Sequence, residues 1–153
     1  MNVTAASVLE AAISALRQKA IDVYTFALYF DHESPAISVC ADTAANSAVT
    51  VRQMNTYNRK YFDPAVASGD LQAASMWCAN IGRSLALGNF AVKNLARTSV
   101  DDADVGEDFY RGMLRALLNV EDKVAALTSN KTSLLLCCSG PSDEAEFCWG
   151  LRA

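Results

Sequence analysis

The sequence is short of several residues and runs that mark particular protein classes. It has one histidine, His32, and no uncharged apolar stretch of about 18 residues, the length that spans a membrane. Its 13 basic residues are scattered and are outnumbered by 17 acidic ones, for a net charge of −4. Because phosphate binding requires clustered Lys and Arg, we do not expect nucleic acid as a partner. Because no apolar stretch is long enough to span a membrane, we do not expect a membrane as a partner either.

Paired cysteines are also missing. The chain has five, an odd number, at positions without a paired spacing: Cys40, Cys78, Cys137, Cys138 and Cys148. The N-terminus lacks the basic and apolar regions of a secretory leader. Together these features predict reduced thiols and a cytoplasmic location. An apolar fraction of 52% in 153 residues predicts one folded domain over residues 1–153.

The N-terminal half contains clear periodic patterns. Apolar residues at intervals of three and four predict a helix over 4–20. Alternation with both faces largely apolar predicts a central strand over 23–30, and a short turn joins it to a second strand over 36–41. A helix is expected from Ala44 to about Asn58, with Pro64 closing that element.

The C-terminal half is less regular at first. Residues 73–80 and 89–95 could each form a helix, and a longer helix is expected over 105–127. An apolar strand over 132–138 and a short last element over 143–150 follow. The expected fold class is therefore α/β of the α+β type, a single domain. Its small sheet would contain the N-terminal hairpin and a late strand, packed by several helices.

The residue spacing gives little support to a metal site or to a nucleophilic cysteine. Structural zinc needs paired thiolates, whereas Cys137 and Cys138 would point to opposite faces of a strand. A Cys40–His32 pair would join a buried thiol to the tip of a hairpin. The glycines between 82 and 88 lack the lysine of a phosphate-binding loop. We expect no metal, no cofactor and no catalytic residue.

Carboxylates remain as candidates for chemistry. Acidic residues are plentiful at Asp31, Glu33, Asp42, Asp63 and Asp143, and two of them facing one cleft could act as an acid–base pair. A small hydrolase or transferase using such carboxylates therefore stays open as an alternative.

The acids also form three clusters along the chain. A surface built from them would steer a basic partner into contact. We take these acids, with the histidine among them, as candidate partner-binding residues: Asp31, His32, Glu33, Asp101, Asp102, Asp104, Glu107, Asp108, Asp143, Glu144 and Glu146.

Three segments resemble an uncharacterised family of small bacterial domains often encoded beside polymorphic toxins. They are the aromatic-rich strand 24–29 with the small-residue run 37–43, the helical segment 109–117, and the apolar strand 133–138 followed by Asp143-Glu144. Together they match the family in order across about two thirds of the chain. The sequence departs from the family at Asp42, where an Asn is expected, and around Trp77.

The resemblance implies an α/β domain with an immunity role. Such a protein binds a cognate toxin domain stoichiometrically and blocks its active site, and the family offers no catalytic set to transfer. The alternatives that stay open are the carboxylate-dependent hydrolase or transferase and a ligand-binding scaffold domain.

Overall fold

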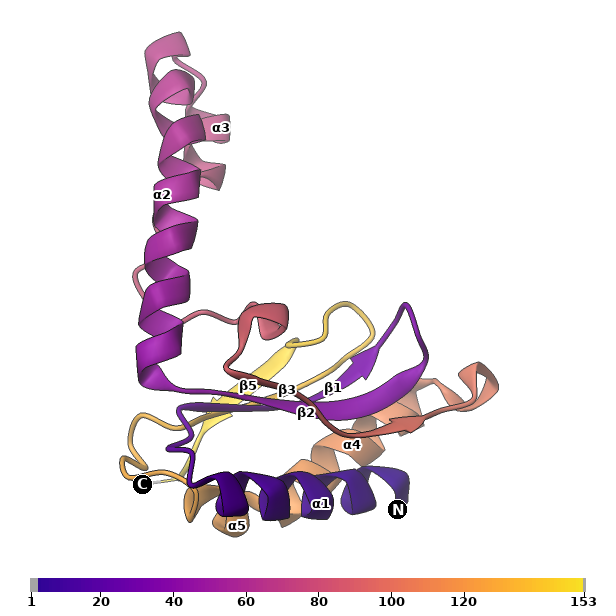
Figure 1. Cartoon of the computed structure of the whole chain (residues 1–153). Helices are drawn as coiled ribbons and strands as arrows, with labels where there is room; N and C mark the ends of the chain where they lie inside the picture. The colour runs from indigo at the N-terminus through magenta and orange to yellow at the C-terminus, as the bar shows by residue number, and fades with distance from the viewer. Residues whose placement is uncertain (1–2, 153) are drawn as a thin grey trace.

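A mixed five-stranded sheet lies at the centre of the protein (Figure 1). The computed structural model describes residues 3–152. The strand order is β3-β2-β1-β4-β5; β1 pairs with β4 in parallel and the other pairs are antiparallel. The strands are β1 (Thr25–Asp31), β2 (Ala36–Asp42), β3 (Val92–Ser99), β4 (Leu135–Cys138) and β5 (Phe147–Gly150). The expected α+β class is confirmed, including the β1–β2 hairpin and the late strand beside it.

Five α-helices accompany this sheet in residues 3–152. They are α1 (Val3–Lys19), α2 (Ala44–Ser68), α3 (Leu71–Met76), α4 (Glu107–Asn119) and α5 (Glu121–Ala125), with 3-10 turns η1 (Leu87–Asn89) and η2 (Asp102–Asp104). No helix in this part of the chain is long and apolar enough to cross a membrane.

One face of the sheet is covered by α1, α4 and α5 (Figure 1). Alternate residues of β1 and β2, among them Phe26, Leu28 and Ile37, point into this layer and are fully buried. Met113 and Leu117 of α4 meet them there. The main core therefore results from two matched periods, every second residue of a strand and every third or fourth residue of a helix.

The opposite face carries a smaller core. Ala27, Tyr29, Cys40 and Cys137 form it together with Phe90 and Leu87, which belong to the irregular segment around η1. This second layer explains why β1 is apolar on both faces, as the sequence predicted.

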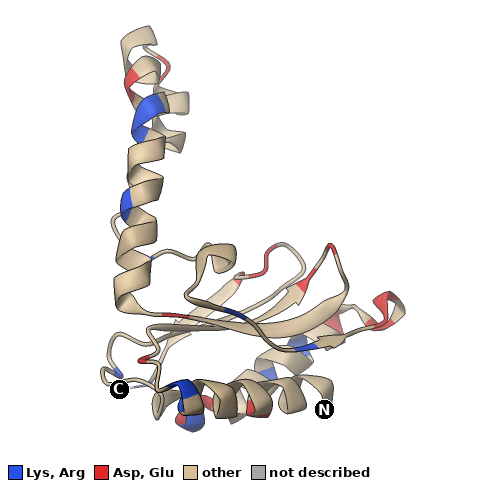
Figure 2. Cartoon of the chain, viewed as in Figure 1, with Lys and Arg blue, Asp and Glu red and all other residues tan. Residues whose placement is uncertain are grey.

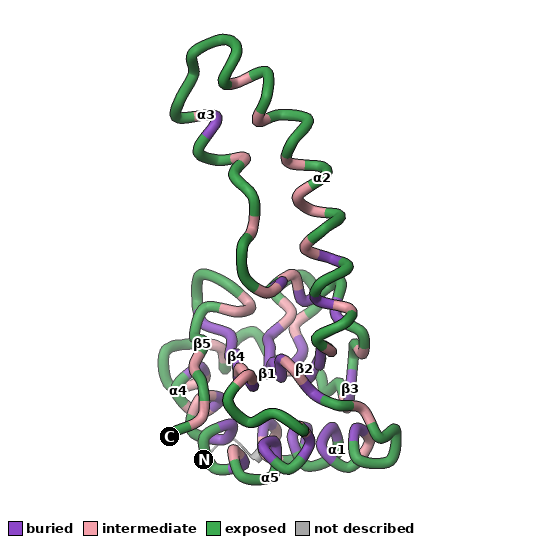
Figure 3. Tube along the Cα trace, turned by 90° about the vertical axis from the view of Figure 1, so that its left-hand side faces the viewer, coloured by how far each residue is buried: buried purple, intermediate pink, exposed green. Residues whose placement is uncertain are grey.

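An arm projects from the sheet (Figures 1 and 3). We use this name for residues 44–86, which contain α2, α3 and the segment that returns to the sheet. Thr43 caps α2 by accepting a hydrogen bond from the Asn46 N–H. Between residues 51 and 83, only Ala74 is buried. The arm is therefore almost entirely a surface feature.

The expected end of this helix before Pro64 is wrong. Pro64 lies inside α2, which continues to Ser68 and stops at Gly69. Gly69 has a positive φ of 76°, the left-handed conformation that glycine adopts readily at a helix end. Pro64 is exposed, so water can reach the carbonyl that the missing N–H leaves without its helical partner.

Three further boundaries differ from the expectations. The helix expected over 89–95 is wrong, because the outer edge of β2 pairs with this segment as β3. The helix expected over 73–80 is present only as α3, and the long helix over 105–127 breaks at Val120 into α4 and α5. In each case the spacing of apolar residues did not reveal which element formed the neighbour.

Candidate functional site: an acidic end of the sheet

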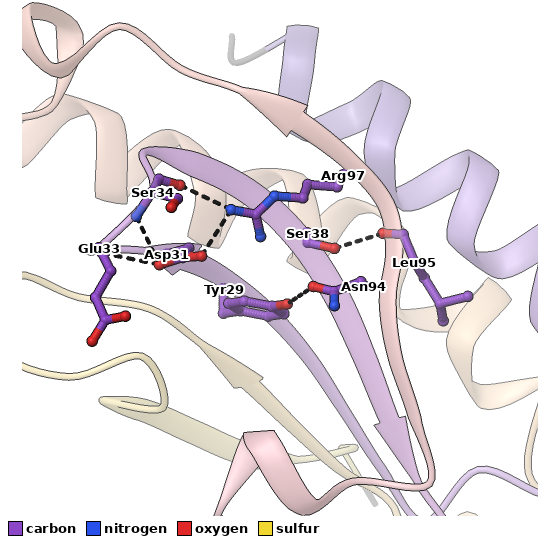
Figure 4. Close-up of polar contacts among 8 residues, drawn as sticks. All are labelled: Tyr29, Asp31, Glu33, Ser34, Ser38, Asn94, Leu95 and Arg97. Atoms are coloured by element: carbon purple, nitrogen blue, oxygen red, sulfur yellow. Dashed lines mark hydrogen bonds and ion pairs between the residues drawn. The ribbon is translucent and has the colours of Figure 1, made fainter.

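The hairpin tip is built around the carboxylate of Asp31 (Figure 4). Its Oδ1 accepts hydrogen bonds from the N–H groups of Glu33 and Ser34, at 2.9 and 3.1 Å. Its Oδ2 accepts a hydrogen bond of 2.7 Å from Arg97, which also donates to the Ser34 carbonyl. These bonds, that of Arg97 first, hold the pKa of Asp31 below its ordinary value. Asp31 thus shapes the turn, whereas the Glu33 side chain remains exposed.

Two polar contacts place Arg97 beside the tip. The Tyr29 hydroxyl donates to Asn94 Oδ1 at 2.9 Å, and the Ser38 hydroxyl donates to the Leu95 carbonyl at 2.9 Å (Figure 4). They hold β3 where it departs from regular geometry, since Asn94 and Ala96 have positive φ angles of 55° and 53°. Arg97 was not predicted as part of the site, because the segment just before it, 89–95, was expected to be a helix and not part of the strand that places Arg97 beside the hairpin.

His32 lies exposed at the hairpin tip, away from Cys40. Its ring meets the edge of Phe30, with the ring centroids 5.0 Å apart. Cys40 is buried and pairs with Ala27, far along the hairpin from the Asp31–Ala36 pair at the tip. Burial raises the pKa of the Cys40 thiol, which disfavours a thiolate there. In residues 3–152 no three His, Cys, Asp or Glu side chains are grouped as metal ligands would be.

The loop between β4 and β5 brings the second acidic cluster to the hairpin tip. The Ser139 hydroxyl accepts a hydrogen bond from the Phe30 N–H at 2.8 Å and donates one to the Glu144 carbonyl at 3.0 Å. Burial raises the pKa of Glu144, and the charges of Asp31 and the other acids nearby raise it further. Ser139 is fully buried, and only the tertiary structure shows it as the link.

The third cluster reaches the same end through the turn after β3. The Val100 N–H donates to the Pro35 carbonyl at 3.0 Å, which fixes the start of the acidic segment 101–108 against the hairpin turn. Phe109 packs edge-on against Phe30, with centroids 5.5 Å apart. Glu146 of the β4–β5 loop faces Tyr110, whose pKa rises through burial and through that charge.

We use the name acidic end for the end of the sheet where the three acidic clusters, 31–33, 101–108 and 143–146, meet (Figure 2). It contains ten acids, and within residues 3–152 ion pairs engage three of them: Asp31 with Arg97, and both Glu107 and Asp108 with Arg111. Because only these two arginines form ion pairs with the ten acids in residues 3–152, the surface stays strongly negative. All the candidate partner-binding residues from the sequence therefore lie at one end of the sheet, opposite the arm.

An open groove of about 850 Å³ borders the acidic end. Asp101, Asp104 and Asp108 line it together with Arg111 and Arg115. The groove is therefore lined by charges of both signs.

The five carboxylates considered for catalysis lie in three places. Asp42 is buried at the base of the arm, where its Oδ1 accepts hydrogen bonds from Asn46 and from the Ala91 N–H. Asp63 lies on the arm and pairs with Arg59. The other three, Asp31, Glu33 and Asp143, belong to the acidic end, but none of them lines the groove.

The arm carries a second exposed surface that the sequence analysis did not single out. Tyr61 stacks on Trp77 with centroids 4.6 Å apart, and Tyr57 packs beside both rings. Eight of the ten exposed large apolar side chains of the described chain lie on the arm: Val49, Tyr57, Tyr61, Val66, Leu71, Met76, Ile81 and Leu85. The spacing of Tyr57 and Tyr61, one helical turn apart, was the available signal.

Comparison with known proteins adds no relative, since no family model, curated protein or solved structure matches this chain.

Proposed function

We propose that the protein is an immunity-type inhibitor that binds a cognate toxin domain in a one-to-one complex and blocks the toxin's active site. One observation carries this proposal: acids from three segments far apart in the sequence converge at one end of the sheet. The fold keeps these like charges together and leaves most of them without a cation. An opposing surface that supplies cations would relieve their mutual repulsion.

The chemistry of the acidic end defines the partner. A surface with ten carboxylates and two paired arginines complements a basic surface. Enzymes that bind polyanionic substrates need such basic surfaces. We therefore expect the cognate toxin to present a basic active site, and the acidic end to occupy it.

Two acids suit a test because the structure gives them no bonding role. Glu33 and Asp104 are exposed, and neither side chain takes part in the hydrogen bonds or ion pairs described for residues 3–152. Asp31 is unsuitable, because its replacement would also remove the bonds that shape the hairpin turn. Asp122 in α5 provides a matched control, since it is exposed and lies away from the acidic end.

The test measures binding of the product of the neighbouring gene by calorimetry, at low and at moderate salt. We expect Glu33→Lys and Asp104→Lys each to weaken binding by roughly tenfold, mainly through slower association, and Asp122→Lys to leave it unchanged. Cells expressing the toxin should be rescued by the wild type and less well by the double variant. Absence of binding together with absence of rescue would refute the proposal.

A further inference from the structure

Two cysteines face each other across the last pair of strands. Cys137 of β4 and Cys148 of β5 are direct partners in the antiparallel register. Their sulfur atoms are 3.2 Å apart. Cys137 is fully buried in the smaller core beside Cys40, whereas Cys148 is exposed at the edge of the sheet. The pair thus combines one accessible thiol with one sheltered thiol in contact with it.

The backbone already suits a covalent link. Direct partners in an antiparallel pair have Cα atoms about 4.5 to 5.5 Å apart, within the range of about 4.4 to 6.8 Å that disulfides allow. Bond formation brings the sulfurs from 3.2 Å to about 2.05 Å. The required movement is small, and β5 can supply it because it is a short strand at the sheet edge.

The surroundings set the order in which the two thiols react. The contacts described for the Cys148 sulfur are those with Cys137 and with the Ala145 carbonyl, at 3.3 Å. Because Cys148 is exposed, reagents in water can reach it. Burial raises the pKa of the Cys137 thiol, and the neighbouring Cys148 raises it further. Cys148 is therefore the thiol that an external reagent meets first, and Cys137 is placed to react with whatever Cys148 carries.

We propose that Cys137 and Cys148 form a reversible disulfide by exchange with a low-molecular-weight disulfide such as oxidised glutathione. The Cys148 thiolate attacks one glutathione sulfur; a mixed disulfide forms, the glutathione disulfide breaks, and one glutathione thiolate leaves. The Cys137 sulfur then attacks the Cys148 sulfur while its proton passes to the departing glutathione, which leaves as a thiol. The two protein thiols lose two electrons, which reduce oxidised glutathione to two thiols.

The bond would close a ring over residues 137–148. This ring contains the loop with Asp143, Glu144 and Glu146, so oxidation fixes both ends of one part of the acidic end. Because a cross-link restricts the unfolded chain, the oxidised protein should melt a few degrees higher than the reduced one. The inference rests on the cysteine geometry alone and does not depend on the proposed inhibitor function.

The chain contains its own control in Cys78. This thiol is also exposed, but it lies on the arm, and the contact described for its sulfur is with the Ala74 carbonyl. Cys78 should therefore accept glutathione and keep it, whereas Cys148 should pass through the mixed disulfide to the internal bond.

The experiment treats the reduced full-length protein with oxidised glutathione and maps the products by mass spectrometry without reduction. Cleavage after glutamate separates Cys148 from Cys137, since Glu144 and Glu146 lie between them. Fragmentation of the linked peptide between the adjacent Cys137 and Cys138 then shows which of the two carries the bond. We expect wild type to carry glutathione at Cys78 and an internal bond from Cys148 to Cys137, which dithiothreitol reverses. In Cys137→Ala, glutathione should remain on Cys148; in Cys148→Ser, only Cys78 should react.

The products mapped in the wild type test the proposal even if Cys137→Ala fails to fold. Glutathione retained on Cys148, an internal bond from Cys148 to Cys40 or Cys138, or no reaction at Cys148 would each overturn the proposal. Tryptophan fluorescence before and after treatment, with Trp149 beside Cys148, verifies that the native fold persists.

Discussion

The arm and the body of the protein differ in how they bury their residues, where the body means residues 3–43 and 87–152. All seven residues of β2 in the body are buried. In the arm, only Ala74 is buried between residues 51 and 83 (Figure 3). One continuous chain leaves β2 and enters α2 directly, so burial changes within a few residues.

The two regions also differ in charge. Residues 44–86 contain four basic and two acidic residues, whereas the remainder of the chain contains nine basic and fifteen acidic ones. The acidic end accounts for much of this excess, and it lies opposite the arm (Figure 2). The protein therefore has a negative end and an apolar, mildly positive arm in separate places.

Contacts at the base hold the arm to the body. The Arg83 guanidinium donates hydrogen bonds to the Tyr24 carbonyl, the Thr25 hydroxyl and the Ser133 carbonyl, and it lies 3.7 Å above the Tyr24 ring. The Ser84 N–H donates to the Ser47 hydroxyl at 3.0 Å. Regions with little buried apolar surface open most easily. The arm therefore depends on this anchor more than on its own core.

The largest expected difference comes from truncating one aromatic side chain in each region. Phe26 is fully buried, and Phe26→Ala should lower the free energy of unfolding by about 3 to 5 kcal/mol through lost burial and a cavity. Tyr61 is 44% exposed, and Tyr61→Ala should leave the unfolding midpoint of the body unchanged. Urea titrations followed by circular dichroism measure both. Equal losses would show that arm and body unfold as one unit.

A smaller effect should follow from cutting the anchor. Arg83→Met removes three hydrogen bonds from a charged donor, and we expect it to destabilise the return segment by about 2 kcal/mol. Trp77 lies in the arm and Trp149 in the body, so the fluorescence of each tryptophan reports the unfolding of its own region. In single-tryptophan variants, Trp77 should report a transition at lower urea than Trp149.

The control for this prediction is Arg59→Met, because Arg59 is an exposed arginine of the arm that pairs with Asp63. It should leave both transitions in place. Coincident transitions at Trp77 and Trp149 in Arg83→Met would mean that the anchor does not hold the arm.

The smallest expected effect compares an ion pair in each region. The Asp31–Arg97 pair of the body is partly buried, with exposed side-chain fractions of 25% and 34%, whereas the Asp63–Arg59 pair of the arm is largely exposed. Arg97→Gln should raise the pKa of Asp31 toward its ordinary value of 3.8, because the largest cause of its lowering is lost. Carboxyl-carbon NMR titration measures this pKa, and Arg59→Gln should not change it.

The sign of the pH dependence follows from the direction of that shift. The pKa of Asp31 is lower in the folded state than in the unfolded chain, so the pair stabilises the fold fully above the unfolded value. This stabilisation is lost as the pH falls through the folded pKa. The stability difference between wild type and Arg97→Gln should therefore shrink as the pH falls below 3.8 and disappear below the folded pKa of Asp31. A difference that persists there would assign the effect to packing instead of charge.

Local patterns predicted the elements that depend on local burial. The alternation in 23–30 and 36–41 predicted the hairpin, and the spacing in 4–20 predicted α1, because each pattern reflects a face turned toward one core. The apolar patterns gave wrong predictions for two elements: α2, which has little core to pack against, and β3, whose pairing with β2 is irregular. The length of α2 beyond Pro64 follows from its exposure on the arm, and β3 forms because β2 offers it a free edge.

The candidate residues were visible in the sequence, but their arrangement was not. The three acidic clusters could be recognised as charge runs, whereas their meeting at one end depends on Ser139, Val100 and Pro35, which bridge distant segments. Cys137 and Cys148 likewise show no paired spacing, and only the register of β4 against β5 brings their sulfurs into contact.

The sequence by itself determined the α+β class, the hairpin, the acidic character and the identity of the acids at the candidate site, because composition and short-range periodicity record these directly. Only the tertiary structure decided that the acids gather at one end, that an exposed arm stands at the other, and that two thiols touch across a strand pair. The physical reason is that each of these depends on contacts between segments distant in the chain, which hydrogen bonds and strand register specify and local patterns do not.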